Sequence, residues 1–211
     1  MSILSKILRR RKEPGAARMC NELSKKLQTK HDPQGVICLI IMRLALHFLE
    51  ELPNHILTLG DPDRVEREMS AWLAVITFYA HSTMVLASQR LTAVQLDCLQ
   101  TYITTVVSNA AVSFYHPSCS EEAKQDLTDA ATKTLNEGIT EYVYAMGVHG
   151  VGKNGSETKL LGLVSRAGSD VAKACGRPND VAALKAINEL LFAGCVVIVE
   201  QVKLDELLME I

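Results

Sequence analysis

Apolar residues recur at intervals of three and four along most of the chain, the spacing that gathers them on one face of an α-helix. One such series consists of Leu96, Leu99, Ile103, Val106, Ala110 and Phe114. Another consists of Leu127, Ala131, Leu135, Tyr142 and Met146. No segment alternates polar and apolar residues convincingly, although residues 195–202 could form a strand. The pattern therefore predicts an all-α protein.

Two Asp-Pro pairs mark helix starts, because aspartate caps a helix and proline is favoured at its first position. The pair beginning at Asp32 predicts a helix over residues 34–52. The pair beginning at Asp61 predicts a helix over residues 63–88, with acidic residues in its first turn, as the helix dipole favours. The early part of helix 34–52 is apolar nearly all round, so we expect this helix to be the central one.

Capping patterns mark the later helices. Thr92 and Gln95 have the spacing of a capping box, and so do Ser118 and Glu121. The other expected elements are a helix over 16–29, a helix over 157–175 capped by Ser156 and ended by Gly176, and a last helix beginning at Asn179 or Asp180. A bundle buries the apolar faces of such helices.

Length and composition suit a single domain of this kind. The chain has 211 residues, of which 48% are apolar and only 5% aromatic, so we expect a core of Leu, Val, Ile and Ala. Its six cysteines form no CxxC pair, which favours buried, reduced thiols in a cytoplasmic protein. We predict a helical bundle of about six to seven helices over residues 16–211, preceded by a basic arm over residues 1–15.

Charge is distributed unevenly between this arm and the rest of the chain. Residues 1–30 hold nine Lys or Arg against two Glu, a net charge of +7, and the remaining residues carry −9. Within residues 2–12, apolar side chains share one face and basic ones flank it, a pattern typical of a short helix lying on an anionic membrane surface. The residues predicted to contact the membrane are Ile3, Leu4, Lys6, Ile7, Leu8, Arg9, Arg10, Arg11 and Lys12.

The energetics favour reversible contact of this arm with a bilayer. Each basic residue near an anionic surface contributes roughly 1 kcal/mol, and burial of the four Ile and Leu side chains adds several more. Two alternatives stay open: the arm is a solubilising tail, or it is a small helix folded back on the bundle. Nucleic-acid binding is disfavoured, because the body is acidic and the arm has no aromatic side chain to stack on bases.

A glycine-rich stretch offers a different candidate chemistry. Residues 147–153, from Gly147 to Lys153, resemble the Walker A loop of P-loop nucleotide hydrolases, in which glycine amides surround phosphate. The residues implied are Gly147, Gly150, Gly152 and Lys153. The resemblance departs from the family at Asn154, where a hydroxyl ligand for magnesium is expected. Helical spacing before the stretch, in place of a strand, favours a connector between helices instead.

No other motif predicts catalysis. The six histidines lack metal-binding spacing, and His81 lies among apolar residues, so we expect it to be partly buried. We predict no catalytic residue, metal or cofactor. The preferred hypothesis is a non-catalytic cytoplasmic interaction or regulatory module with a protein partner, peripheral at the inner face of a membrane. The alternative is a nucleotide- or phosphate-binding protein that uses residues 147–154; the sequence also leaves a homo-oligomer open.

Overall fold

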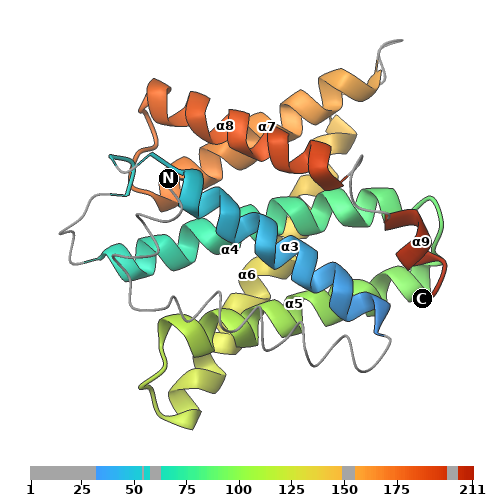
Figure 1. The fold of residues 1–211 in the computed structure, drawn as a ribbon, viewed down its shortest axis with the longest axis horizontal. Helices are drawn as coiled ribbons and strands as arrows, with labels where there is room; N and C mark the ends of the chain where they lie inside the picture. Colours follow the sequence, from blue (N-terminus) through green and yellow to red (C-terminus); the bar gives the residue numbers. More distant parts are fainter. Residues whose placement is uncertain (1–31, 54, 58–62, 149–154, 199–203) are drawn as a thin grey trace, which may run out of the picture.

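The computed structural model describes residues 32–53, 55–57, 63–148, 155–198 and 204–211 (Figure 1). Across these ranges it contains seven helices and no strand, which confirms the predicted all-α bundle. The helices are α3 (Pro33–Glu51), α4 (Arg64–Ala87), α5 (Ala93–Tyr115), α6 (Glu121–Val148), α7 (Gly155–Ala174), α8 (Val181–Val196) and α9 (Leu204–Leu208). The helix predicted over residues 16–29 lies outside the described residues.

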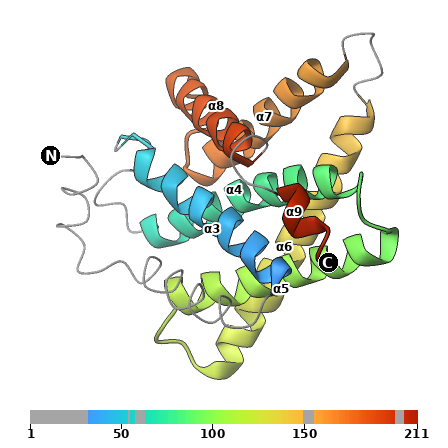
Figure 2. The same ribbon diagram turned by 45° about the vertical axis from the view of Figure 1, so that its right-hand side comes forward.

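The central helix of the bundle is α4. It packs against α3, α5, α6, α7 and α8. In both views it runs between α5 on one side and α7 and α8 on the other, and α6 crosses it (Figures 1 and 2). Every residue from Ala71 to His81 is buried except Ala74, which is half-buried. The prediction that helix 34–52 is central is wrong, because Arg43, His47 and Glu51 keep one side of α3 exposed.

Helix α4 can pack against five other helices because hydroxyl groups on it form hydrogen bonds within the helix itself. The Thr77 hydroxyl donates to the Leu73 carbonyl at 2.8 Å, and the Ser82 hydroxyl donates to the Phe78 carbonyl at 2.9 Å. Because these hydroxyls bond to their own helix, their burial leaves no unmade hydrogen bond. Gly138 of α6 lets the two helices approach, since a Cβ there would lie 2.7 Å from the Thr77 Cγ2 atom. The mean hydropathy of a helix does not reveal hydrogen bonds within it or close contacts such as that of Gly138 with Thr77.

Several predicted helix caps are confirmed. An Asp32 carboxylate oxygen accepts from the Gly35 amide at 3.0 Å, with Pro33 in the first turn. The Thr92 capping box forms in both directions. The Asp180 carboxylate caps α8. Gly176 ends the α7 segment with a φ of 71°, a left-handed conformation that glycine adopts without strain.

Other boundaries differ from the predictions. Helix α4 begins at Arg64, and its N-cap is Asp63, whose side chain makes no capping bond. The pair at Asp61, from which the start was predicted, lies outside the described residues. Helix α6 is capped by Ser120, whose hydroxyl accepts from the Ala123 amide at 3.3 Å, and not by Ser118. A turn closed by the Cys119 amide and the His116 carbonyl separates Ser118 from the helix.

The two ends of the last long helices also correct the predictions. Helix α7 begins at Gly155, one residue before the predicted cap Ser156. Residues 195 and 196 belong to α8, and residues 197 and 198 continue helically after it, so the strand alternative is wrong for this described part of residues 195–202. Cys195 and Ile198 are both buried in the common core, and their spacing of three residues places them on one face of a helix.

Helices α3 and α4 are long and apolar enough to cross a membrane by length and composition. In the bundle, 44% of the most apolar window of α3 and 61% of that of α4 are buried. A core helix of a water-soluble bundle passes the same test, so the finding is weak evidence for a membrane span. The buried residues of both helices pack in the common core of the bundle.

Candidate functional site

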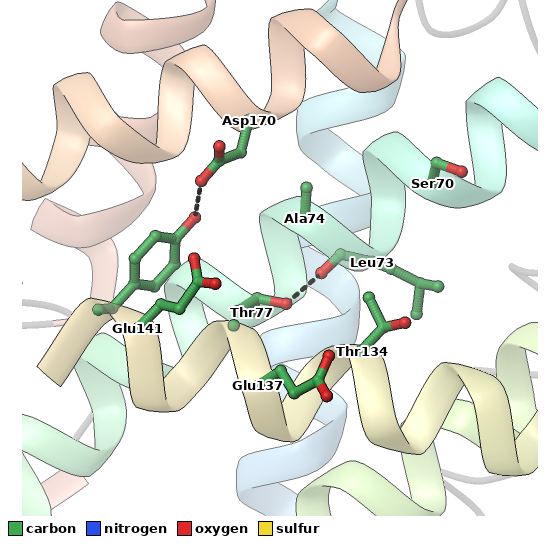
Figure 3. A pocket seen from close by; sticks show the side chains of 10 residues that line it. Ser70, Leu73, Ala74, Thr77, Thr134, Glu137, Glu141 and Asp170 are labelled. Atoms are coloured by element: carbon green, nitrogen blue, oxygen red, sulfur yellow. Dashed lines mark hydrogen bonds between the residues drawn. The ribbon is translucent and has the colours of Figure 1, made fainter. Parts of the chain in front are cut away.

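A cleft of about 360 Å³ opens between α4, α6 and α7 (Figure 3). Helix α4 supplies apolar and hydroxyl-bearing side chains, whereas α6 and α7 supply carboxylates and a tyrosine. The lining residues are Ser70, Leu73, Ala74, Thr77, Thr134, Glu137, Gly138, Glu141, Tyr142 and Asp170. The volume lies near the lower end of the range for ligand pockets. The close approach of α6 to Thr77 places the carboxylates of α6 beside α4.

A polar network joins α6 to α7 at one end of the cleft. The Tyr142 hydroxyl donates to an Asp170 carboxylate oxygen at 3.2 Å (Figure 3). The Arg166 guanidinium donates to the same Asp170 oxygen and to a Glu141 oxygen, each at 3.2 Å. Burial, followed by the charge of Asp170 and the hydrogen bond to it, raises the pKa of Tyr142 far above its ordinary value. The tyrosine therefore remains a neutral hydrogen-bond donor at physiological pH.

The carboxylates of the cleft already have cationic neighbours. Glu137 lies 3.9 Å from Lys133, and Asp170 lies 3.8 Å from Lys173 as well as against Arg166. Among the described residues, no group of three or more His, Cys, Asp or Glu side chains could hold a metal ion. Exposed ion pairs of this kind contribute little stability and exchange partners readily. The cleft is therefore suited to receiving a polar or basic group by exchange of ion pairs.

His81 lies in the core behind Tyr142. Its ring packs edge-on against the Tyr142 ring, with centroids 5.7 Å apart, and the residue is 1% exposed. Burial lowers the pKa of His81 to about 4, against the opposing effect of a backbone hydrogen bond with Ile139. The burial is deeper than the partial burial predicted from the sequence. A neutral, enclosed imidazole fits a packing role.

The described thiols are mostly buried. Burial raises the pKa of Cys38 well above its ordinary value, and it raises the pKa of Cys175 and of Cys195 to about 11. A thiol is nucleophilic chiefly as the thiolate, so these three cysteines are poor nucleophiles. Cys98 is exposed and Cys119 is intermediate. The prediction of buried thiols is confirmed for the first three of these residues.

Most of the residues predicted to form a site lie outside the part of the chain that the structure describes. The membrane-contact residues of the arm, together with Gly150, Gly152 and Lys153, lie outside the described residues. Gly147 belongs to the last turn of α6, and α7 begins at Gly155. The glycine-rich stretch therefore joins two helices, whereas a Walker A loop follows a strand. Whether it binds phosphate stays a prediction.

Sequence reasoning missed the cleft because its residues are widely separated along the chain. Ser70 of α4 and Asp170 of α7 lie a hundred positions apart, and helical periodicity does not report which helices meet. One local signal was present. Thr134, Glu137 and Glu141 recur at helical spacing around Gly138, a glycine inside a long helix, which often marks a close helix contact.

The chain was compared with protein-family models, with curated proteins and with solved structures, and it matches none of them.

Proposed function

We propose that this chain is a non-catalytic helical interaction or regulatory module that binds an anionic membrane surface through residues 3–12. The observation that carries the proposal is the separation of charge, +7 in residues 1–30 against −9 in the rest. An anionic surface attracts the first part and repels the second. The arm is thus the part of the chain suited to contact the membrane, and the bundle is held away from it, at the cytoplasmic face.

The chemistry of the described residues supports a binding role. Three thiols are buried with raised pKa values, and His81 is enclosed in the core with a lowered pKa. The Tyr142 hydroxyl and the carboxylates beside it contact one another or nearby cations. The exposed side of α6, by contrast, carries six acidic side chains, which complement a basic surface of a protein partner.

Vesicle co-sedimentation tests the membrane part of the proposal. The intact chain should sediment with vesicles containing phosphatidylserine and not with vesicles of phosphatidylcholine alone, and binding should weaken as salt rises. Deletion of residues 1–13 should abolish this sedimentation. Equal binding to both kinds of vesicle, or undiminished binding after the deletion, would rule the proposal out.

Nucleotide binding is not proposed as a second function, because no observation favours a phosphate-binding loop over a connector between helices at residues 147–154. Helix α6 runs into Gly147 without a strand, and the described residues offer no sheet from which a phosphate loop could extend. The alternative has its own test: Lys153→Ala should abolish any thermal stabilisation by ATP. An ATP-dependent rise in the unfolding temperature that Lys153→Ala removes would restore it.

A further inference from the structure

We propose that the basic amphipathic arm, residues 3–12, docks in the cleft between α4, α6 and α7 whenever no membrane holds it. The proposal rests on the proposed function, because the same side chains would contact either the membrane or the cleft. The bundle then acts as an intramolecular competitor for the arm. The sequence left open that the arm folds back on the bundle, and the proposal places that contact in this cleft.

The cleft offers two surfaces that match the two sides of the arm. The half-buried Ala74 and the edge of the buried Leu73 give the α4 side of the cleft an apolar character (Figure 3). Gly138 of α6 also lines the cleft and adds no side chain to it. Carboxylates of α6 and α7 line the same cleft. The arm combines four Ile and Leu residues with Lys6 and the basic run 9–12. Apolar side chains over α4 would leave the basic side chains beside the carboxylates.

The charge of α6 extends this match beyond the cleft. The helix carries six acidic residues and two basic ones, which accounts for four of the nine excess negative charges outside residues 1–30. Exposed acidic residues of α6 are Glu121, Glu122, Asp126, Asp129, Glu137 and Glu141. Glu137 and Glu141 line the cleft, and Glu141 also pairs with Arg166 of α7. The other four continue the acidic surface along α6 away from the cleft. Five basic residues of the arm complement it.

Ion pairs at the cleft do not block docking. Glu137 and Lys133 lie 3.9 Å apart with side chains that are 64% and 77% exposed, so the pair is hydrated and weak. Arg166 shows that these carboxylates accept a guanidinium, since it bridges Glu141 and Asp170. An arginine of the arm can take up the same type of contact with Glu137.

Because the arm and the bundle belong to one chain, a weak affinity between the arm and the cleft is enough for docking. Asp32 is anchored in the bundle, where it caps α3 and accepts a hydrogen bond from the Tyr102 hydroxyl at 2.6 Å. With the helix predicted over residues 16–29, the intervening residues 13–31 span at most roughly 40 Å. A tether of this kind gives an effective concentration of about a millimolar. A dissociation constant of about 0.1 mM between arm and cleft would therefore keep the arm docked about nine-tenths of the time.

A photo-cross-linker tests the contact without any lipid. Benzoylphenylalanine is placed at Ile7 of the full chain, and the products are mapped by mass spectrometry at low salt. We expect cross-links within one chain to residues 70–77 of α4 and 134–141 of α6, with a yield that falls at high salt. Cross-links to other helices, cross-links between two chains, or none at all would each overturn the proposal.

Two matched variants separate docking from net charge. Glu137 and Glu189 each lie near a lysine four residues earlier, at 3.9 and 4.0 Å, and their side chains are 64% and 68% exposed. Glu137→Lys should lower the cross-link yield roughly threefold or more, through repulsion of the basic arm, and should raise vesicle binding because the competing state is lost. Glu189→Lys, on α8, should lower the yield little. Equal effects of the two variants would overturn the proposal.

These experiments distinguish failure of docking from failure of the membrane role. Cross-links to the cleft, lost on Glu137→Lys, together with no sedimentation of either protein with phosphatidylserine vesicles, would refute the membrane role and uphold docking. Sedimentation that depends on residues 1–13, together with cross-links outside the cleft, would uphold the membrane role and refute docking.

Discussion

Helices α4 and α6 are comparable in length and lie against each other, yet they use their polar residues in opposite ways. Helix α4 encloses Thr77, Thr83 and His81 within the bundle. Helix α6 buries one narrow stripe and leaves acidic side chains exposed along the rest of its length. The buried residues of α6 with described side chains are Thr128, Ala131, Leu135, Ile139 and Tyr142. The difference indicates that stability is concentrated around α4, whereas α6 presents the surface available to other molecules.

Truncating the largest side chain of α4 should cause the greatest loss in the free energy of unfolding. Trp72 is 1% exposed and contacts the Tyr115 ring at a centroid distance of 6.3 Å. Trp72→Ala should lower the free energy of unfolding by about 3–5 kcal/mol, because it leaves a cavity in a closely packed core. Urea denaturation measures the change. Glu137→Ala, at an exposed side chain of α6, is the control, and it should shift stability by less than about 0.5 kcal/mol. Similar losses in both variants would remove the distinction between the helices.

Acid should weaken the α4 core through His81. Burial lowers the pKa of His81 from about 6.5 to about 4, so the unfolded chain binds more protons than the folded chain between these values. His81 therefore lowers stability as pH falls from about 6.5 to about 4, and above that window it makes no such contribution. By linkage the loss approaches about 2–3 kcal/mol at pH 4.5. Denaturation of the wild type and His81→Phe at pH 7 and 4.5 measures it. A pH dependence unchanged by the substitution would contradict the assignment.

The contact between the two helices can be tested at Gly138. Alanine ordinarily stabilises a helix interior relative to glycine, but here the added Cβ would lie 2.7 Å from the Thr77 Cγ2 atom. Gly138→Ala should therefore destabilise the bundle by about 1–3 kcal/mol, as overpacking does. Thr77→Ser removes the opposing methyl group, so the double variant should recover part of the loss. Strictly additive effects in thermal or urea unfolding would show that the two residues are not in contact.

A smaller effect is expected where α6 meets α7. Tyr142→Phe removes the hydroxyl that donates to Asp170 at 3.2 Å while keeping the ring beside His81. The expected loss of stability is about 1–2 kcal/mol, the range for a partly buried hydrogen bond to a charged group. Asp170→Asn in the same background should then cost less than it does in the wild type. Independent effects in this double-mutant cycle would argue against the hydrogen bond.

The sequence was informative wherever structure is decided locally. The Asp32 and Thr92 caps, the Gly176 stop and the helical periods of α5 and α6 all follow from residues within a few positions of one another. The central place of α4 and the position of the cleft depend on which helices meet, through contacts such as Gly138 with Thr77. Periodicity contains no such information, and hydropathy pointed to α3 instead. The cap at Ser120 was missed because two serines compete there and only a turn at His116 separates them.

Amide hydrogen exchange of the intact chain, with and without phosphatidylserine vesicles, tests most directly the claim that the arm binds the membrane while the bundle stays intact. The account predicts that vesicles slow exchange in residues 2–12, speed it slightly along the cleft side of α6 as the arm departs, and leave α4 unchanged. Altered exchange in α3 or α4, with none in residues 2–12, would contradict the account, because the apolar helices themselves would then be meeting the bilayer.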